Sequence, residues 1–220
     1  IKMKELKNVG ASLQDSVRLL NDVDLEEYCA GFRQLEQAEQ KRIERQQLLL
    51  QGFQRKIALI ESLETELNQI TLGMRPALWR MDHQIEDQFR AQKAAVTARA
   101  NWTDWMPAAD LSFLFSAVDP EHALHWGFAM EAPLAEALEL DKQDSVYYPA
   151  VPCVRMVFCT HNEVLLRYEN LQPALSYLEK HAFALAGDIL GRSIARVMGK
   201  ENTIIHYYDV WLPIKDREIL

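Results

Sequence analysis

The sequence predicts an α+β protein in which a long helix precedes a domain of two similar strand–helix–strand–strand units. Two observations support this fold class. Between residues 26 and 72, apolar residues recur every seven positions, which is the spacing of a coiled-coil seam. Between residues 73 and 220, the order strand, helix, strand, strand occurs twice. We therefore divide the chain into residues 1–25, a helix at 26–72 and a domain at 73–220.

The predicted helix at 26–72 contains no proline, and Glu, Gln, Lys and Arg surround its apolar positions. A stripe of this length cannot be buried on a compact domain this small, so it needs another helix. We expect a dimerisation helix; the alternative is a long amphipathic helix that folds onto its own domain. The stripe consists of two columns, Ile43, Leu50 and Ile57 in one and Phe53, Ile60 and Leu67 in the other.

Residues 1–25 are predicted to form two short helices. Gly10 is well placed to end the first one. Ser12 can cap the second, with Asp15 three residues later as its acidic partner.

Residues 1–20, IKMKELKNVGASLQDSVRLL, resemble the second half of the DNA-binding domain of MerR-family transcription regulators. In that family, this stretch comes directly before a long dimerisation helix. The family's N-terminal helix-turn-helix does not occur in this chain, and because the chain does not begin with Met we expect it to be part of a longer protein. The resemblance implies that four basic residues contact the DNA backbone without reading its sequence: Lys2, Lys4, Lys7 and Arg18.

Residues 73–220 begin after Gly73 and Pro76, which break the helical pattern. The first unit is predicted as a strand at 76–81, a helix at 85–100 and strands at 111–115 and 123–130. The second unit is predicted as a strand at 151–159, a helix at 168–180 and strands at 194–198 and 204–212.

The second unit resembles the GyrI-like effector-binding domain of the multidrug-sensing MerR branch. The resemblance rests on the motif Tyr168-Glu-Asn-Leu and on a last strand that ends Asp209-Val-Trp-Leu-Pro-Ile214. It implies an antiparallel sheet, a homodimer with antiparallel helices, and promoter DNA and RNA polymerase as partners. It also implies a small organic effector, aromatic or lipophilic, that alters promoter DNA geometry. No cofactor is implied.

The domain is rich in aromatic residues, and aromatic rings beside an acid form a site for flat, lipophilic, often cationic ligands. Alternation places Tyr207, Asp209 and Trp211 on one face of the last strand. An acid inside a strand needs a partner, and we expect either that Arg196 neutralises it or that the ligand is neutral or anionic. The candidate ligand-binding residues are Trp102, Trp105, Trp126, Tyr147, Tyr148, Phe158, Tyr207, Asp209 and Trp211.

The composition excludes several classes of protein. The net charge is −8, no apolar run is long enough to span a membrane, and the three cysteines form no disulfide framework, so we expect reducing cytoplasm. Cys153 and Cys159 are expected to be buried small hydrophobes, and no metal site is expected. The function is therefore predicted to be non-enzymatic regulation. The alternatives are a ligand-sequestering protein or a small-molecule hydrolase that uses Asp209 with Tyr147 or Tyr207, and a coiled-coil scaffold would leave the aromatic residues unexplained.

Overall fold

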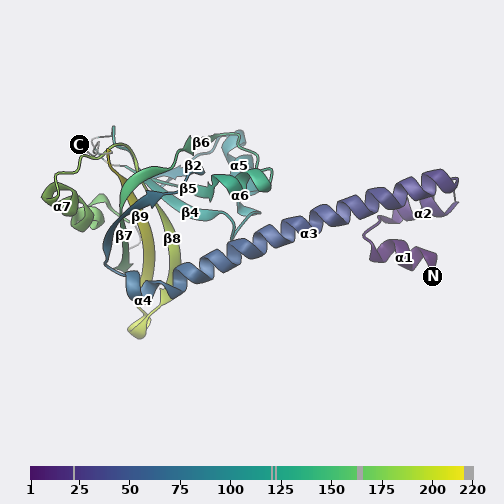
Figure 1. Ribbon diagram of the computed structural model, residues 1–220, viewed down its shortest axis with the longest axis horizontal. Coiled ribbons are helices and arrows are strands. Elements are labelled where there is room, and N and C mark those ends of the chain that lie inside the picture. The colour runs from purple at the N-terminus through teal and green to yellow at the C-terminus, as the bar shows by residue number, and fades with distance from the viewer. Residues whose placement is uncertain (22, 120, 122, 163–165, 216–220) are drawn as a thin grey trace. The chain divides into compact units, whose positions relative to one another are not determined.

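The computed structural model describes the chain except for residues 22, 120, 122, 163–165 and 216–220 (Figure 1). The chain divides into two compact units, Ile1–Leu50 and Gln51–Leu220. One helix, α3 (Leu25–Glu61), contributes residues to both units. Among the described residues, the first unit contains helices and the second contains the sheet.

The first unit begins with two short helices, α1 (Lys2–Asn8) and α2 (Leu13–Asn21), as predicted. Gly10 lies between them with a φ of 82°, a conformation that glycine adopts without strain. The Ser12 hydroxyl accepts a hydrogen bond from the Asp15 amide at 3.0 Å and donates one to the Asp15 carboxylate at 2.6 Å. Ser12 therefore caps α2 in the way that the sequence predicts.

A glycine allows α2 to pack closely against the beginning of α3. A Cβ atom at Gly31 would lie 2.4 Å from Cδ2 of Leu19, so a larger residue would force the Leu19 side chain to move. Leu19 and Leu6 are buried in this unit. Asp24 caps α3, because its carboxylate accepts a hydrogen bond from the Glu27 amide at 2.8 Å.

The long helix is shorter than predicted. It ends at Glu61, and the four-residue helix α4 (Leu63–Glu66) then leads into strand β1 (Ile70–Arg75). Asn68 has a φ of 61°, and its amide donates to a carbonyl of the sheet at 2.7 Å. Leu67 forms a bridge to the sheet and does not extend the apolar column of the helix. The prediction of a helix up to residue 72 is therefore wrong, because strand pairing overrides the seven-residue pattern.

The second unit is built on a nine-stranded antiparallel sheet, and the predicted α+β fold class is confirmed. The strand order is β1-β7-β9-β8-β4-β5-β2-β3, with β6 paired to β2. The two predicted units, β2-α5-β4-β5 and β7-α7-β8-β9, meet where β4 pairs with β8. The elements after β1 are β2 (Leu78–Ile85), β3 (Gln88–Phe89), α5 (Lys93–Thr103), β4 (Asp110–Phe115), β5 (Leu124–Glu131), α6 (Ala132–Ala137), β6 (Ser145–Tyr148), β7 (Val151–His161), the 3₁₀ helix η1 (Tyr168–Leu171), α7 (Gln172–Lys180), β8 (Ile189–Met198), the 3₁₀ helix η2 (Lys200–Asn202) and β9 (Ile204–Pro213).

The sequence does not predict β1, β3 or β6. Helix α5 begins at Lys93 and not at residue 85, because β2 continues to Ile85 and pairs there with β3. The other strands and α7 lie within a few residues of their predicted positions.

The two faces of the sheet differ in chemistry. On one face, α7 covers an apolar core that includes Leu178, Val154, Tyr208 and Leu212. The opposite face carries a smaller apolar cluster and a set of charged residues that contact the end of α3. We call it the ion-pair face, and its charged and aromatic residues on the strands include Asp110, Glu131, Tyr148, Arg155, Arg192, Tyr207, Asp209 and Trp211.

A second glycine of α3 allows the helix to contact the domain. A Cβ atom at Gly52 would lie 2.9 Å from both the nitrogen and the Cα atom of Ala108. Because these are backbone atoms, which cannot rotate away, only glycine allows this contact. The end of α3 is thus held next to β4, which starts at Asp110.

Candidate functional site

Asp209 occupies the centre of the ion-pair face and is completely buried. Arg155 of β7 donates from Nε to Oδ1 of Asp209 at 2.7 Å. Arg192 of β8 donates to Oδ2 from Nη2 at 3.0 Å and from Nε at 3.2 Å. Both oxygens of this carboxylate therefore receive charged donors, which compensates for the loss of hydration.

The ion pairs continue from Asp209 in two directions, to α4 through Arg155 and to α3 through Arg192 and Asp110. On one side, Arg155 pairs with Glu66 of α4 at 2.7 Å. On the other side, Arg192 lies 3.4 Å from Asp110, and Asp110 also accepts a hydrogen bond from Arg55 of α3 at 2.9 Å.

Two further charged residues complete this network. Arg55 lies 3.1 Å from Glu131, and Lys56 lies 3.6 Å from Asp110 and donates to the Ser193 carbonyl at 2.8 Å. The network thus contains four cations and four anions, so its formal charges balance. Its members are Arg55, Lys56, Arg155 and Arg192, with Glu66, Asp110, Glu131 and Asp209.

The network shifts the protonation of its members. The hydrogen bond from Arg155 lowers the pKa of Glu66. Burial alone would lower the pKa of Arg155, but its hydrogen bonds to Glu66 and Asp209 outweigh this and raise it. Burial lowers the pKa of Lys56, although Asp110 opposes the shift. Burial disfavours the charged forms of these three side chains, whereas their oppositely charged partners favour them.

The guanidinium of Arg192 lies over the indole ring of Trp211, 5.0 Å from its centroid. Next to it is a cavity of about 10 Å³, lined by residues that include Leu78, Ser112, Leu190 and Trp211. A space of this size holds at most about one water molecule. Small-molecule sites usually measure about 300–1,000 Å³, so a ligand here would have to displace side chains.

The structure brings four of the nine candidate ligand-binding residues to this face. Tyr207 alternates with Asp209 and Trp211 along β9, whereas Tyr208, Val210 and Leu212 belong to the core of the α7 face. Asp209 and Trp211 meet at Arg192, and Tyr148 packs against the apolar cluster that contains Trp211.

The other five candidates lie elsewhere. Phe158 and Trp126 belong to the core of the α7 face, and Trp102 is fully buried in α5. Tyr147 is half exposed and packs against Trp79 at 5.2 Å. Trp105 is partly buried in a loop.

The predicted partner of Asp209 is not Arg196. Arg192 pairs with Asp209 across β8 and β9, whereas Arg196 lies opposite His206. The register of β8 against β9 shifts by one residue between Ser193 and Ala195, which brings Arg192 and not Ser193 opposite Asp209, and Arg196 is too far along β8 in either register. Sequence reasoning also does not identify Arg155, Asp110 or Glu131. Arg155 is a charge within a predicted strand, whereas Asp110 and Glu131 each lie one residue outside the predicted strands at 111–115 and 123–130.

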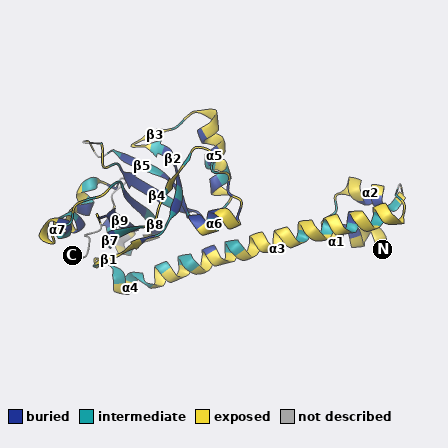
Figure 2. Ribbon diagram, turned by 45° about the horizontal axis from the view of Figure 1, so that its top comes forward, coloured by how far each residue is buried: buried dark blue, intermediate teal, exposed yellow. Residues whose placement is uncertain are grey.

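The apolar stripe of α3 remains exposed. Ile43 is 44%, Leu50 55%, Phe53 55%, Ile57 52% and Ile60 45% exposed. Figure 2 shows most of the helix in the colour of exposed residues. This stripe follows the predicted seven-residue spacing as far as Ile60.

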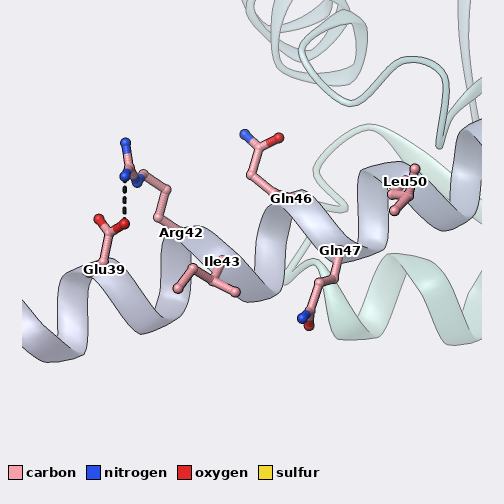
Figure 3. Close-up of a pocket in the computed structure, with 6 residues that line it drawn as sticks. All are labelled: Glu39, Arg42, Ile43, Gln46, Gln47 and Leu50. Atoms are coloured by element: carbon pink, nitrogen blue, oxygen red, sulfur yellow. Dashed lines mark hydrogen bonds and ion pairs between the residues drawn. The ribbon is translucent and has the colours of Figure 1, made fainter.

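Two hollows follow this stripe within the first unit, each of about 340 Å³. The one in Figure 3 is lined by α3 alone, where Ile43 and Leu50 lie among Gln46, Gln47 and the ion pair of Glu39 with Arg42. A hollow lined by one helix cannot enclose a small ligand, but it can accept the side chains of a second helix. The other hollow is lined by Val9, Phe32, Leu35, Glu36, Glu39, Gln40 and Ile43.

The four basic residues predicted to contact DNA are all exposed. Lys2, Lys4 and Lys7 lie on α1, and Arg18 lies on α2. In the described part of the chain, no helix is long and apolar enough to cross a membrane.

No protein-family model matches the chain, and no curated protein does either. Among solved structures, the chain is similar to EcmrR in a cryo-EM structure of the EcmrR–DNA complex in EcmrR-RPo. That match has 14% identity and a TM-score of 0.41, over 98% of this chain and 81% of the other. A crystal structure of the EcmrR C-terminal domain matches with 11% identity and a TM-score of 0.43, over 68% of this chain and 98% of the other. A hydrolase from Listeria innocua matches with 11% identity and a TM-score of 0.42, over 70% of this chain and 96% of the other. At such low values, none of these structures assigns a role to a residue of this chain.

Proposed function

We propose that this chain is part of a DNA-binding transcription regulator that acts as a homodimer and responds to a small organic molecule. The observation that carries the proposal is the exposed apolar stripe of α3, which in chain order follows two short helices that together carry four basic and two acidic residues and precedes an α+β domain. This order of elements is the one that the resemblance of residues 1–20 and 153–214 to MerR-family regulators implies. The proposed division by role is residues 1–25, 26–72 and 73–220, with α3 and α4 in the second segment and strand β1 across the boundary between the second and the third.

Dimerisation follows from the stripe. Five apolar side chains at coiled-coil spacing are each about half exposed, and burying them against a second copy is favourable by about 25 cal/mol per Å² of apolar surface. Glu, Gln, Lys and Arg flank the stripe, as expected for positions at the edge of such a seam. By the resemblance, the two helices are antiparallel.

DNA binding is assigned to the first unit. Lys2, Lys4, Lys7 and Arg18 would contact the phosphate backbone and so position the dimer on promoter DNA. RNA polymerase is the further partner that the resemblance implies.

Effector binding is assigned to the ion-pair face. Trp211 and Tyr148 offer ring surfaces, and Arg192 lies over Trp211. The cavity is too small for an aromatic molecule, so the effector would displace Arg192 or its neighbours. Asp110 binds both Arg192 and Arg55, and displacing Arg192 would therefore alter the ion pairs that hold the end of α3. Arg192 would thus have two arrangements, one paired with Asp110 and one displaced by the effector. An effector that binds the second better would shift the dimer between two states.

A hydrolase is not proposed, because no observation favours it. Both oxygens of Asp209 accept hydrogen bonds from arginines, and Tyr147 packs against Trp79 on another part of the sheet. An acid held between two guanidinium groups is poorly placed to exchange a proton with a substrate.

The DNA-binding role is tested with the natural gene product and duplex promoter DNA. Affinity should fall as salt rises, and the triple variant Lys2→Glu/Lys4→Glu/Lys7→Glu should bind more weakly and with a shallower salt dependence. The matched control Lys93→Glu/Lys180→Glu/Lys215→Glu changes the net charge equally, at exposed positions of the second unit. If both variants lose affinity equally, net charge and not α1 governs binding.

The effector role is tested by tryptophan fluorescence with a panel of flat cationic, neutral and anionic dyes. Trp211→Ala should weaken the binding of any dye that quenches the wild-type protein. Trp105→Ala is the control, since Trp105 lies in a loop outside this face. Unchanged binding by Trp211→Ala would place the site elsewhere.

A further inference from the structure

Arg192 is surrounded as a bound cationic ligand would be. Its guanidinium lies 5.0 Å from the ring centroid of Trp211 and donates to Asp209 at 3.0 Å. Two more carboxylates lie at 3.4 Å, from Asp110, and at 3.9 Å, from Glu131. The Arg192 side chain is only 12% exposed. A flat cation over an indole ring with carboxylates at its edge is a favourable arrangement for aromatic amidinium and guanidinium compounds.

Arg155, the other partner of Asp209, differs in how its guanidinium is placed. It lies opposite Trp211 across β7 and β9, but its guanidinium pairs with Glu66 and Asp209, and its side chain is 25% exposed. Replacing either arginine therefore removes one positive charge, but only the guanidinium of Arg192 lies over the ring of Trp211.

We propose that Arg192 sets the charge selectivity of the ion-pair face by occupying the place of a cationic ligand. The native chain therefore excludes flat organic cations, and loss of the Arg192 side chain converts this face into a site for them. The proposal deepens the effector role proposed above and rests on that role being located here.

Charge and volume support the exclusion. With Arg192 in place, four cations balance four anions, so an added cation would carry uncompensated charge into a half-buried site. The neighbouring cavity of about 10 Å³ also leaves no room for a ring. Without Arg192, four carboxylates face three cations, and the space of the lost guanidinium opens over Trp211.

The test compares benzamidinium, a flat cation, with benzamide, its neutral analogue of nearly equal shape. Binding is followed by tryptophan fluorescence and by the melting temperature. In Arg192→Ala, benzamidinium should bind on the order of 30-fold more tightly than in the wild-type protein, which corresponds to a desolvated cation–π contact. Benzamide should not show this gain.

Two control variants separate an opened site from a simple loss of charge. Arg155→Ala removes the same charge beside Asp209 and should gain no affinity for benzamidinium. Arg192→Lys keeps a cation in place and should also gain none. A similar gain in Arg155→Ala, or equal benzamidinium affinity in the wild-type protein and Arg192→Ala, overturns the proposal.

The test remains decisive if Arg192→Ala does not fold. In that case, benzamidinium but not benzamide should restore the folded state by replacing the missing guanidinium. Failure of both compounds to restore it overturns the proposal. The proposed effector role is tested separately. It stands if the wild-type protein binds a neutral or anionic dye and Trp211→Ala weakens that binding.

Discussion

Replacing Asp209 by alanine should destabilise the second unit more than any other single loss of a carboxylate in the ion-pair network. Asp209 is fully buried, and it accepts three hydrogen bonds from two guanidinium groups. Its loss leaves Arg155 paired with Glu66 alone, and Arg192 near Asp110 at 3.4 Å and Glu131 at 3.9 Å. Two like charges then face each other across the vacated space.

The size of the effect follows from these contacts. Removing one partner of a buried ion pair costs about 3–5 kcal/mol. Arg155 is 25% exposed and both arginines keep another carboxylate, so we expect a loss of about 2–3 kcal/mol. For a domain of this size, that corresponds to a fall in melting temperature of about 4–12 °C.

The assay is urea unfolding of the wild-type protein, Asp209→Ala, Arg192→Met and the double variant, with Asp104→Ala as an exposed control. The control should stay within about 0.5 kcal/mol of the wild type. The double variant should be more stable than the sum of the single effects predicts, by about 0.5–3 kcal/mol, because it removes both members of a pair. Additive effects, or a loss below about 0.5 kcal/mol in Asp209→Ala, would refute this description of the network.

Three further predictions follow from other parts of the chain. The double variant Leu50→Glu/Ile57→Glu should be monomeric in sedimentation velocity, because it places charge in the apolar stripe. The control Gln51→Glu/Ala58→Glu adds the same number of acidic residues at neighbouring exposed positions and should remain dimeric. If the first variant is also dimeric, the stripe is not the interface. Gly52→Ala should lower the melting temperature although alanine favours helices by about 1 kcal/mol, because its Cβ atom would meet the Ala108 backbone; a higher melting temperature would contradict that contact. Burial, and then the nearby Arg99 and Arg80, lower the pKa of His83 to about 4, so the unfolded chain takes up this proton near pH 6.5 and the folded chain does so only near pH 4. The contribution of His83 to stability is thus complete above pH 6.5 and declines as the pH falls to 4. The free energy of unfolding of His83→Phe should therefore depend less on pH over this range than that of the wild-type protein. Equal slopes of unfolding free energy against pH for the two proteins would disprove this.

The sequence predicts the elements whose signals are local. Ser12 and Asp15 form a cap within one turn of helix, and the alternation of residues 204–212 indicates a strand. The end of α3 cannot be predicted in this way, because Leu67 satisfies both the helical column and a strand bridge to Val157. A contact ninety residues away along the chain decides between the two, and no pattern within residues 60–75 contains it.

The same limit applies to the site. An acid at position 209, inside a strand, already indicates that a charged partner exists. Which arginine fills that role depends on the register of β8 against β9, and the shift between Ser193 and Ala195 places Arg192 beside Asp209. The second partner, Arg155, comes from the strand on the other side of β9. Neither neighbour can be identified before the strand order is known.

Ion pairs hold both the end of α3 and the following helix α4 to the sheet. Arg55 binds Asp110, which also binds Arg192, and Glu66 binds Arg155, which also binds Asp209. Because Arg192 and Arg155 share Asp209, a change at either arginine reaches both points of attachment through one carboxylate. The outer pairs, Arg55 with Asp110 and Arg155 with Glu66, are partly exposed and are screened by salt, whereas the pairs of Asp209 are buried and cost more to break. A ligand that moves Arg192 would therefore have to favour one arrangement by at least the cost of breaking its pair with Asp209, and that difference in affinity would couple the ligand site to the way α3 is held.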